Sequence, residues 1–342
     1  MVMDINSKWA CEELECRVLR TLSGSGFNTN KVKTKPCEFR SDDIYIFRGL
    51  CKAVLSRQTN WDKVVGVLPI IAEVLCNYDI EKVASLSDKE IDKRYKEKLE
   101  GKTEVSFLRR KLKHCRKNAE VFQDIRQQHS SVWQFIKGYL NENEYDKSKK
   151  CYIQPNDDNL IKCFIEARSP FKLSGVRLAI CCEFFNNIGI DEFKPDEHAI
   201  IVLVSIGAVG RRSKSPEDIR EEGAVNKESP KEIRQIGIKI AETLGKPRKY
   251  VDSLLWNFGR RICTKGSPTC NSCRLKIEEP AFCEGIPDWD GFLKAVIVKD
   301  PFGTAEVMKR HGFTRNEARK EMEKAGLEPD EIEEILRKVY GP

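Results

Sequence analysis

Apolar side chains recur at helical spacing along most of the chain, and this pattern constrains the fold more than any other feature. Residues three and four apart form apolar faces, as in amphipathic helices. Strand-type alternation is missing, and the β-branched run at 199–207 follows Pro195 and Asp196, so it fits a buried helix equally well. We therefore predict an all-α protein. The clearest helical segments are residues 43–58, 61–76, 105–125, 159–167 and 230–245.

Length and composition narrow the class of protein. A chain of 342 residues that is 40% hydrophobic and 33% charged can form two domains, or one domain with two lobes. No apolar run reaches the roughly 18 residues of a membrane span, and the acidic start does not look like a secretory signal. We expect an intracellular protein, cytoplasmic if the cell is prokaryotic, and a monomer. Clustered cysteines in such a compartment indicate a metal site and not disulfides.

Basic residues concentrate between Lys93 and Lys117, where eleven Lys or Arg stand against three Glu. Such a run is either a solvated helix face or a surface that binds phosphates. The run by itself does not decide between the two.

Residues 171–200 hold several chemistry-bearing positions. Gly175 stands between two helical patterns, Gly189 fits a helix C-cap, and Asp196 stands at a helix N-cap position. A glycine turn between helices exposes N–H groups that can hold a phosphate. A carboxylate at a helix N-terminus stays ionised, and can stabilise a sugar cation or activate water. An ordinary helical hairpin with an Asp cap explains the same pattern.

Four ordered motifs together resemble the helix-hairpin-helix DNA glycosylases, the superfamily of endonuclease III and the adenine mismatch glycosylase. The motifs are "LSRQTNW" (55–61), "LSGV" (173–176), "KPDEHA" (194–199) and "LLWNFGRRICTKGSPTCNSC" (254–273). The resemblance implies a base-excision-repair enzyme that hydrolyses the N-glycosidic bond of a damaged or mispaired base. It implies Asp196 as the catalytic residue and double-stranded DNA as the partner. The residues that it places on DNA are Gln58, Gly175, Val176 and Arg177.

The same resemblance implies two helical lobes around a cleft. The glycosylase domain would span residues 1–285, with a middle lobe at about 49–175. The N-terminal segment and residues 176–285 would form the second lobe. Residues 286–342 would be a helical extension, either a small cap or a helix-turn-helix.

The cysteine-rich segment begins with Cys263, Cys270 and Cys273, and Cys283 follows. The resemblance implies a 4Fe–4S cluster held by these four thiolates. The family leaves six, two and five residues between its ligands, whereas this chain leaves six, two and nine. Cys283 as fourth ligand therefore needs a longer loop. A structural zinc site is the alternative.

Family members that also cut the DNA strand carry a lysine nucleophile eighteen residues before the aspartate. That position is Leu178 here, and Lys172 and Lys194 are the nearest lysines to consider. We therefore expect a monofunctional glycosylase. The alternatives are a bifunctional glycosylase/AP lyase and a non-catalytic iron–sulfur or zinc DNA-binding protein. The excised base stays open among alkylated purines, oxidised bases, uracil and mismatched thymine.

Overall fold

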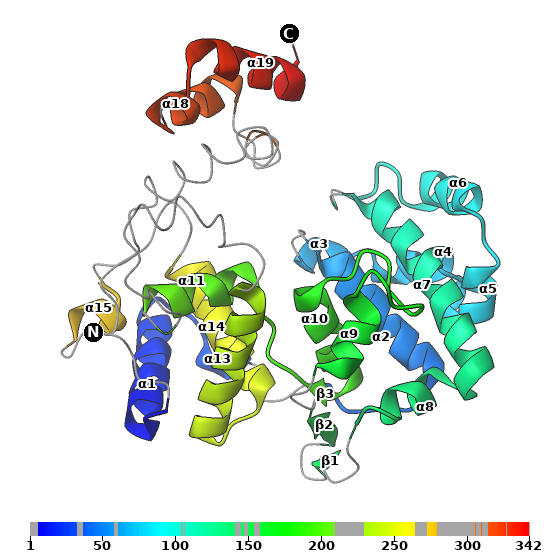
Figure 1. The fold of residues 1–342 in the computed structure, drawn as a ribbon, viewed down its shortest axis with the longest axis horizontal. Coiled ribbons are helices and arrows are strands. Elements are labelled where there is room, and N and C mark those ends of the chain that lie inside the picture. Colours follow the sequence, from blue (N-terminus) through cyan, green and yellow to red (C-terminus); the bar gives the residue numbers. More distant parts are fainter. Residues whose placement is uncertain are drawn as a thin grey trace.

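Most of the described part of the chain is helical. The strands within it are three pieces of two or three residues. The predicted all-α class is therefore confirmed, and Figure 1 shows two bodies of helices side by side. The computed structural model describes residues 6–32, 37–57, 61–103, 105, 107–140, 145–146, 150–153, 158–206, 208, 229–263, 272–278, 305, 309, 314–325 and 327–341.

The first lobe is the larger body and is built around α2 (Asp43–Ser56), α7 (Leu108–His129) and α10 (Leu178–Ile188). Phe47, Phe122 and Phe184 come from these three helices and are fully buried. The ring of Phe122 lies 5.7 Å from that of Phe47 and 6.3 Å from that of Phe184. The surrounding helices are α3 (Trp61–Val65), α4 (Leu68–Val74), η2 (Cys76–Tyr78), α5 (Ile80–Ala84), α6 (Asp88–Lys98), α8 (Val132–Lys137) and α9 (Asn159–Ile165).

The second lobe combines the start of the chain with its later helices. In Figure 1 the blue helix α1 stands beside the yellow helices α13 and α14, and all three pack on one another. Gly259 allows α14 to approach α11, because a Cβ there would lie 2.5 Å from the carbonyl oxygen of His198. The lobe consists of α1 (Lys8–Gly24), η1 (Thr29–Lys31), α11 (Glu197–Ser205), α13 (Ser229–Leu244), α14 (Arg248–Arg261) and α15 (Arg274–Ile277).

The change from one core to the other falls later in the chain than Gly175. Helix α10 packs on α2, and Ile190 still belongs to the first core, whereas Phe193 belongs to the second. The apolar face of α10 explains the difference, since the hairpin before it lies inside the first lobe. A small sheet marks the crossing, with β1 (Tyr145–Asp146) antiparallel to β2 (Cys151–Ile153) and β2 parallel to β3 (Ile190–Asp191).

A buried arginine joins the two lobes. Arg234 on α13 is 1% exposed and pairs with Glu192 at 2.5 Å. The same guanidinium donates to Asp158, which stands before α9 of the first lobe. Asp191 adds a second link, because its carboxylate accepts the N–H groups of Arg248 and Lys249 at the start of α14.

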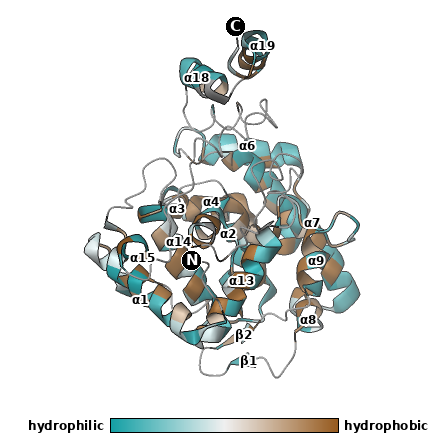
Figure 2. Cartoon of the chain, turned by 60° about the vertical axis from the view of Figure 1, so that its left-hand side comes forward, coloured by the Kyte–Doolittle hydropathy of each residue, from teal (hydrophilic) through white to brown (hydrophobic). Residues whose placement is uncertain are grey.

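Helix α6 presents a hydrophilic surface. Figure 2 shows α6 as mostly hydrophilic, and Ile91 is its one fully buried residue.

Near the C-terminus α18 (Arg315–Ala325) and α19 (Pro329–Tyr340) pack on each other around their own small core. The β-branched run after Asp196 is helical, as part of α11. None of the described helices is both long and apolar enough to cross a membrane.

Candidate functional site

The connection from α9 to α10 contains a tight turn that requires a glycine for two reasons. Gly175 has a φ of +73°, in the left-handed region. A Cβ at this position would lie 2.9 Å from the ring of His114 on α7. Ser174 is fixed on the same helix, since it exchanges two hydrogen bonds with Asn118 (2.6 and 3.1 Å) and its Oγ lies 2.8 Å from Nδ1 of His114. Helix α7 therefore holds the hairpin in one conformation.

The hairpin residues differ in what they present to solvent. Arg177 is exposed at the N-cap of α10, and no ion pair among the described residues involves it. Val176 is 3% exposed, and its N–H points to the carbonyl of Leu173 at 3.4 Å. Of the predicted DNA-contacting residues here, Arg177 offers a side chain and Val176 packs in the core.

Several cations gather beside this hairpin. Burial lowers the pKa of Arg57, at the end of α2, and the charges of Arg177 and Arg110 lower it further. Burial, followed by Arg110 and Arg57, also lowers the pKa of His114. Lys111 donates to the carbonyl of Leu55 at 3.1 Å, and its pKa is lowered to about 8 by burial, Arg57 and Arg110. Cations that destabilise one another in this way form a site suited to an anion.

Helix α7 shows that the basic run has two faces. Arg109 and Lys113 pair with Asp92 on α6 at 2.5 and 2.9 Å, so they belong to a surface network. Arg110 and Lys117 take part in no ion pair within the described part of the chain. The solvated-face interpretation therefore holds for Arg109 and Lys113, and phosphate binding by Arg110 and Lys117 stays a prediction.

Asp196 caps α11 with one carboxylate oxygen. Its Oδ1 accepts the N–H groups of His198 (3.1 Å) and Ala199 (3.2 Å). The predicted N-cap geometry is present, and the side chain is 15% exposed. The two donors fix the orientation of the carboxylate at the start of α11. Its Oδ2 remains available for another partner.

That partner is Lys194. Its Nζ lies 3.3 Å from Oδ2 of Asp196 and 3.6 Å from Oε2 of Glu183 on α10. Burial lowers the pKa of Lys194, but the two carboxylates outweigh burial, so the pKa is raised. The amine is therefore held protonated beside the aspartate.

The other lysine that the sequence raised lies elsewhere. Lys172 is exposed, and its Nζ donates to the carbonyl of Ile165 at 3.0 Å. Leu178 begins α10 and supplies no amine. Of the two lysines, the structure brings Lys194 to Asp196.

Three residues near Asp196 escaped the sequence analysis. Glu183 lies 3.5 Å from Nζ of Lys249, which lies 2.5 Å from Oδ2 of Asp252. Lys249 and Asp252 belong to α14. The available signal was a charged residue inside an apolar stretch, "AICCEFF" for Glu183 and "KYVDSLLW" for the other two.

The cysteine segment begins at the end of α14. Cys263 follows this helix and Cys273 is the N-cap of α15, and both are buried in the second core at 4% and 3% exposure. Cys270 and Cys283 lie outside the described residues. Within the described ranges no group of three potential metal ligands occurs. Two thiols of the predicted four are thus placed in one core.

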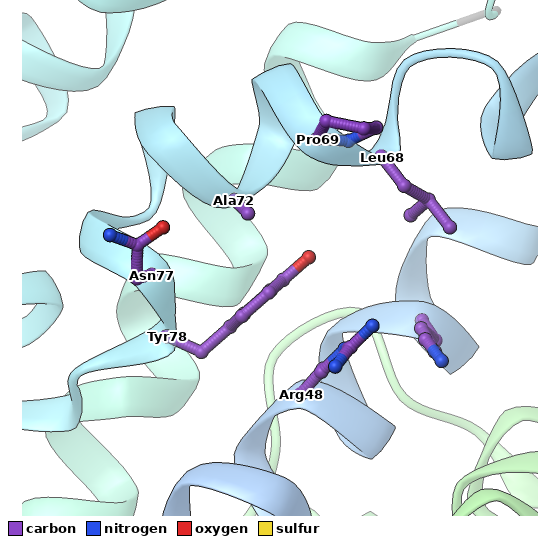
Figure 3. A pocket seen from close by; sticks show the side chains of 7 residues that line it. Arg48, Leu68, Pro69, Ala72, Asn77 and Tyr78 are labelled. Carbon is purple, nitrogen blue, oxygen red and sulfur yellow. The ribbon is translucent and has the colours of Figure 1, made fainter.

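Other predicted contacts are placed in part. Gln58 lies outside the described residues, and Trp61, three residues further on, is 37% exposed. A pocket of about 310 Å³ lies between α2, α4 and η2, where Arg48 stands over the ring of Tyr78 at 5.9 Å (Figure 3). It contains none of the predicted site residues.

Residues 35–165 match the family model of methyladenine glycosylase. The resemblance to the helix-hairpin-helix glycosylases is confirmed. The match covers most of the first lobe and ends before the hairpin and Asp196. A solved structure of endonuclease III in a trapped covalent intermediate with DNA is similar at 16% identity and a TM-score of 0.46. It covers 80% of this chain and 95% of that chain. No curated protein matches the chain.

Proposed function

We propose that the protein is a monofunctional DNA glycosylase of base excision repair, acting on a damaged or mispaired base in duplex DNA. The observation that carries the proposal is the Asp196 carboxylate, held by two N–H donors and one protonated lysine. The family match and the cationic hairpin support the same class of enzyme.

The chemistry requires the base to leave the helical stack. A base inside a duplex is inaccessible, so the nucleotide is flipped out while Gln58 fills the gap. Cleavage of the glycosidic bond places positive charge on the sugar, and Asp196 stabilises that charge and orients water. The hairpin and the cations near Arg177 hold the backbone through contacts that do not depend on sequence.

The state of Lys194 argues for water as the nucleophile. An amine attacks a sugar carbon only when it is unprotonated, and Glu183 and Asp196 raise the pKa of Lys194. The position of the family's lysine holds Leu178. One observation favours the bifunctional alternative, namely the 3.3 Å between Lys194 and Asp196. If the Lys194 ammonium lost its proton on DNA binding, its amine would become the Schiff-base nucleophile.

A 4Fe–4S cluster on Cys263, Cys270, Cys273 and Cys283 is part of the proposal. The two described thiols fit it, because both are buried in the second core, Cys263 just after α14 and Cys273 at the start of α15. Bound there, the cluster would be a structural crosslink. Purified protein should be yellow-brown with about four irons per chain, and Cys263→Ser should bleach it. A colourless protein with one zinc per chain would show that the cysteines form a zinc site.

The domain assignment follows from the same proposal. Residues 1–285 form the glycosylase and residues 286–342 the helical extension, and the protein acts as a monomer on DNA. The experiment is single-turnover excision on a panel of lesion duplexes. Alkylated adenine comes first, because the matching family is described as methyladenine glycosylase.

Asp196→Asn tests the catalytic role directly. The amide still caps α11, so the variant should fold and bind duplex, while excision should fall by roughly 100-fold or more. Asp42→Asn is the matched control, since Asp42 caps α2 through the N–H of Tyr45. Borohydride added during turnover should trap no protein–DNA adduct. Near-normal excision by Asp196→Asn would refute the assignment, and an adduct lost in Lys194→Met would establish the bifunctional alternative.

A further inference from the structure

Five charged side chains of alternating sign form a continuous series from Asp196, through α10, to α14. In order they are Asp196, Lys194, Glu183, Lys249 and Asp252, and we call them the charge chain. Consecutive members lie 3.3, 3.6, 3.5 and 2.5 Å apart. They come from three segments, namely α10, α14 and the strand-to-helix connection before α11. Each lysine therefore stands between two carboxylates.

The two ends of the charge chain differ in their access to solvent. The side chains of Asp196, Lys194 and Glu183 are 15–18% exposed, whereas Lys249 is 8% and Asp252 is 4% exposed. Asp196 is thus the end that a substrate can reach. Asp252 is the end that the protein encloses.

The charges in this set do not balance. Three carboxylates and two ammonium groups leave one excess negative charge when all five are ionised. Burial of an unbalanced charge is costly, so the set favours one additional proton. Burial and the neighbouring Asp196 raise the pKa of Asp252 to about 6, although Lys249 opposes them. Burial lowers the pKa of Lys249, but Asp252 and Glu183 outweigh it and raise that pKa, so this ammonium stays charged.

We propose that Asp252 is a positioning residue that sets the charge of the catalytic site through the charge chain, although it touches no substrate itself. The inference rests on the proposed function. With Asp252 ionised, the site carries an extra negative charge that favours a cationic transition state. With Asp252 protonated, the charge chain carries no net charge.

The titratable groups that face α14 from α11, α13 and α1 contact residues other than Asp252. On α11, His198 contacts the ring of Trp256. From α13, Glu242 pairs with Arg248, and from α1, Glu15 accepts the hydroxyl of Tyr250.

The charge of the Asp252 carboxylate also acts on the thiol of Cys182 on α10, as the smallest of the contributions to its raised pKa. Burial is the main cause of the high pKa of this thiol, which stays neutral. The groups that change charge near Asp252 are therefore members of the charge chain.

The test is the rate of single-turnover excision between pH 5 and 8 for wild type and Asp252→Asn. The wild-type rate should rise through pH 6 by about three- to tenfold, the effect of one charge at short range in a partly screened site. Asp252→Asn should match wild type at pH 5 and lack the rise. Glu242→Gln removes an exposed carboxylate of α13 and should keep the rise.

Several results would overturn the proposal. They are a wild-type rate without a step, or a step that persists in folded Asp252→Asn. If Asp252→Asn does not fold, Lys249→Gln decides, since loss of the adjacent cation should move the step to higher pH. A step that stays in place would then overturn it.

Failure of the proposed function is distinguishable from failure of this inference. Loss of excision in Asp196→Asn, with an unchanged step in Asp252→Asn, would leave the glycosylase and remove the role of Asp252. If wild type excises no base, melting temperatures carry the test. A raised carboxyl pKa stabilises the folded state at low pH, and this contribution is lost as pH rises through the folded pKa. Wild type should then lose stability relative to Asp252→Asn between about pH 4 and 7, and a constant difference would overturn the proposal.

Discussion

Replacement of Gly175 by alanine should destabilise the first lobe by about 1.5–3.5 kcal/mol. A residue with a Cβ costs roughly 1–2 kcal/mol at a left-handed φ such as the +73° found here. The added Cβ would lie 2.9 Å from the ring of His114, which must then move. That ring is held by Ser174 at 2.8 Å, and loss of the hydrogen bond costs about 0.5–1.5 kcal/mol more.

Thermal and urea unfolding of Gly175→Ala measure this cost, and the expected fall in melting temperature is about 5–10 °C. Gly101→Ala is a matched control. Gly101 has the same φ of +73° but nothing within 4 Å of an added Cβ, so it should lose only the backbone part. In a His114→Ala background, Gly175→Ala should cost only the backbone part, because the ring and its hydrogen bond are already gone. Equal losses at the two glycines, or an undiminished cost in the His114→Ala background, would refute the reasoning.

Two further outcomes follow from described contacts. Arg177→Gln should lower the salt dependence of duplex binding by about one unit of slope in a log–log plot, as for one lost phosphate contact, whereas Lys98→Gln, whose ammonium pairs with Glu73, should leave it unchanged. Arg234→Met should cost about 3–5 kcal/mol in the free energy of unfolding, because it leaves the fully buried Glu192 without its cation; a loss under 1 kcal/mol in urea unfolding would contradict this.

The local elements were predictable because each is specified by neighbouring residues. Helical spacing placed α2, α7 and α13, and the Pro-Asp pair before an apolar run placed the cap of α11. The glycine between two helical patterns placed the turn at Gly175. These features need only a few residues each, and the order of the motifs then linked them to the glycosylase family.

The arrangement of the lobes and the surroundings of Asp196 depend on packing between distant segments. Helix α10 joins the first core because its aromatic face meets Phe122 and α2, which the hairpin motif does not specify. Lys249 and Asp252 lie more than fifty residues from Asp196 in sequence. Their charges meet those of Glu183 and Lys194 only once α14 packs against α11 and Lys249 reaches Glu183 on α10. Such a set has no local spacing to recognise.

Because of the order of their segments in the chain, the two lobes are completed at different times during synthesis. The first lobe is continuous from α2 to β3, so it has all its own residues as soon as β3 leaves the ribosome. Helix α1 is made first, yet its partners α13 and α14 are made much later. Domains fold as they are completed, and apolar surface exposed in the interval is prone to aggregation. The buried face of α1, with Leu14, Val18 and Leu22, therefore has to wait uncovered while the first lobe folds. A nascent chain stalled before α13 should accordingly expose α1 to chaperones and proteases, although its first lobe is already complete.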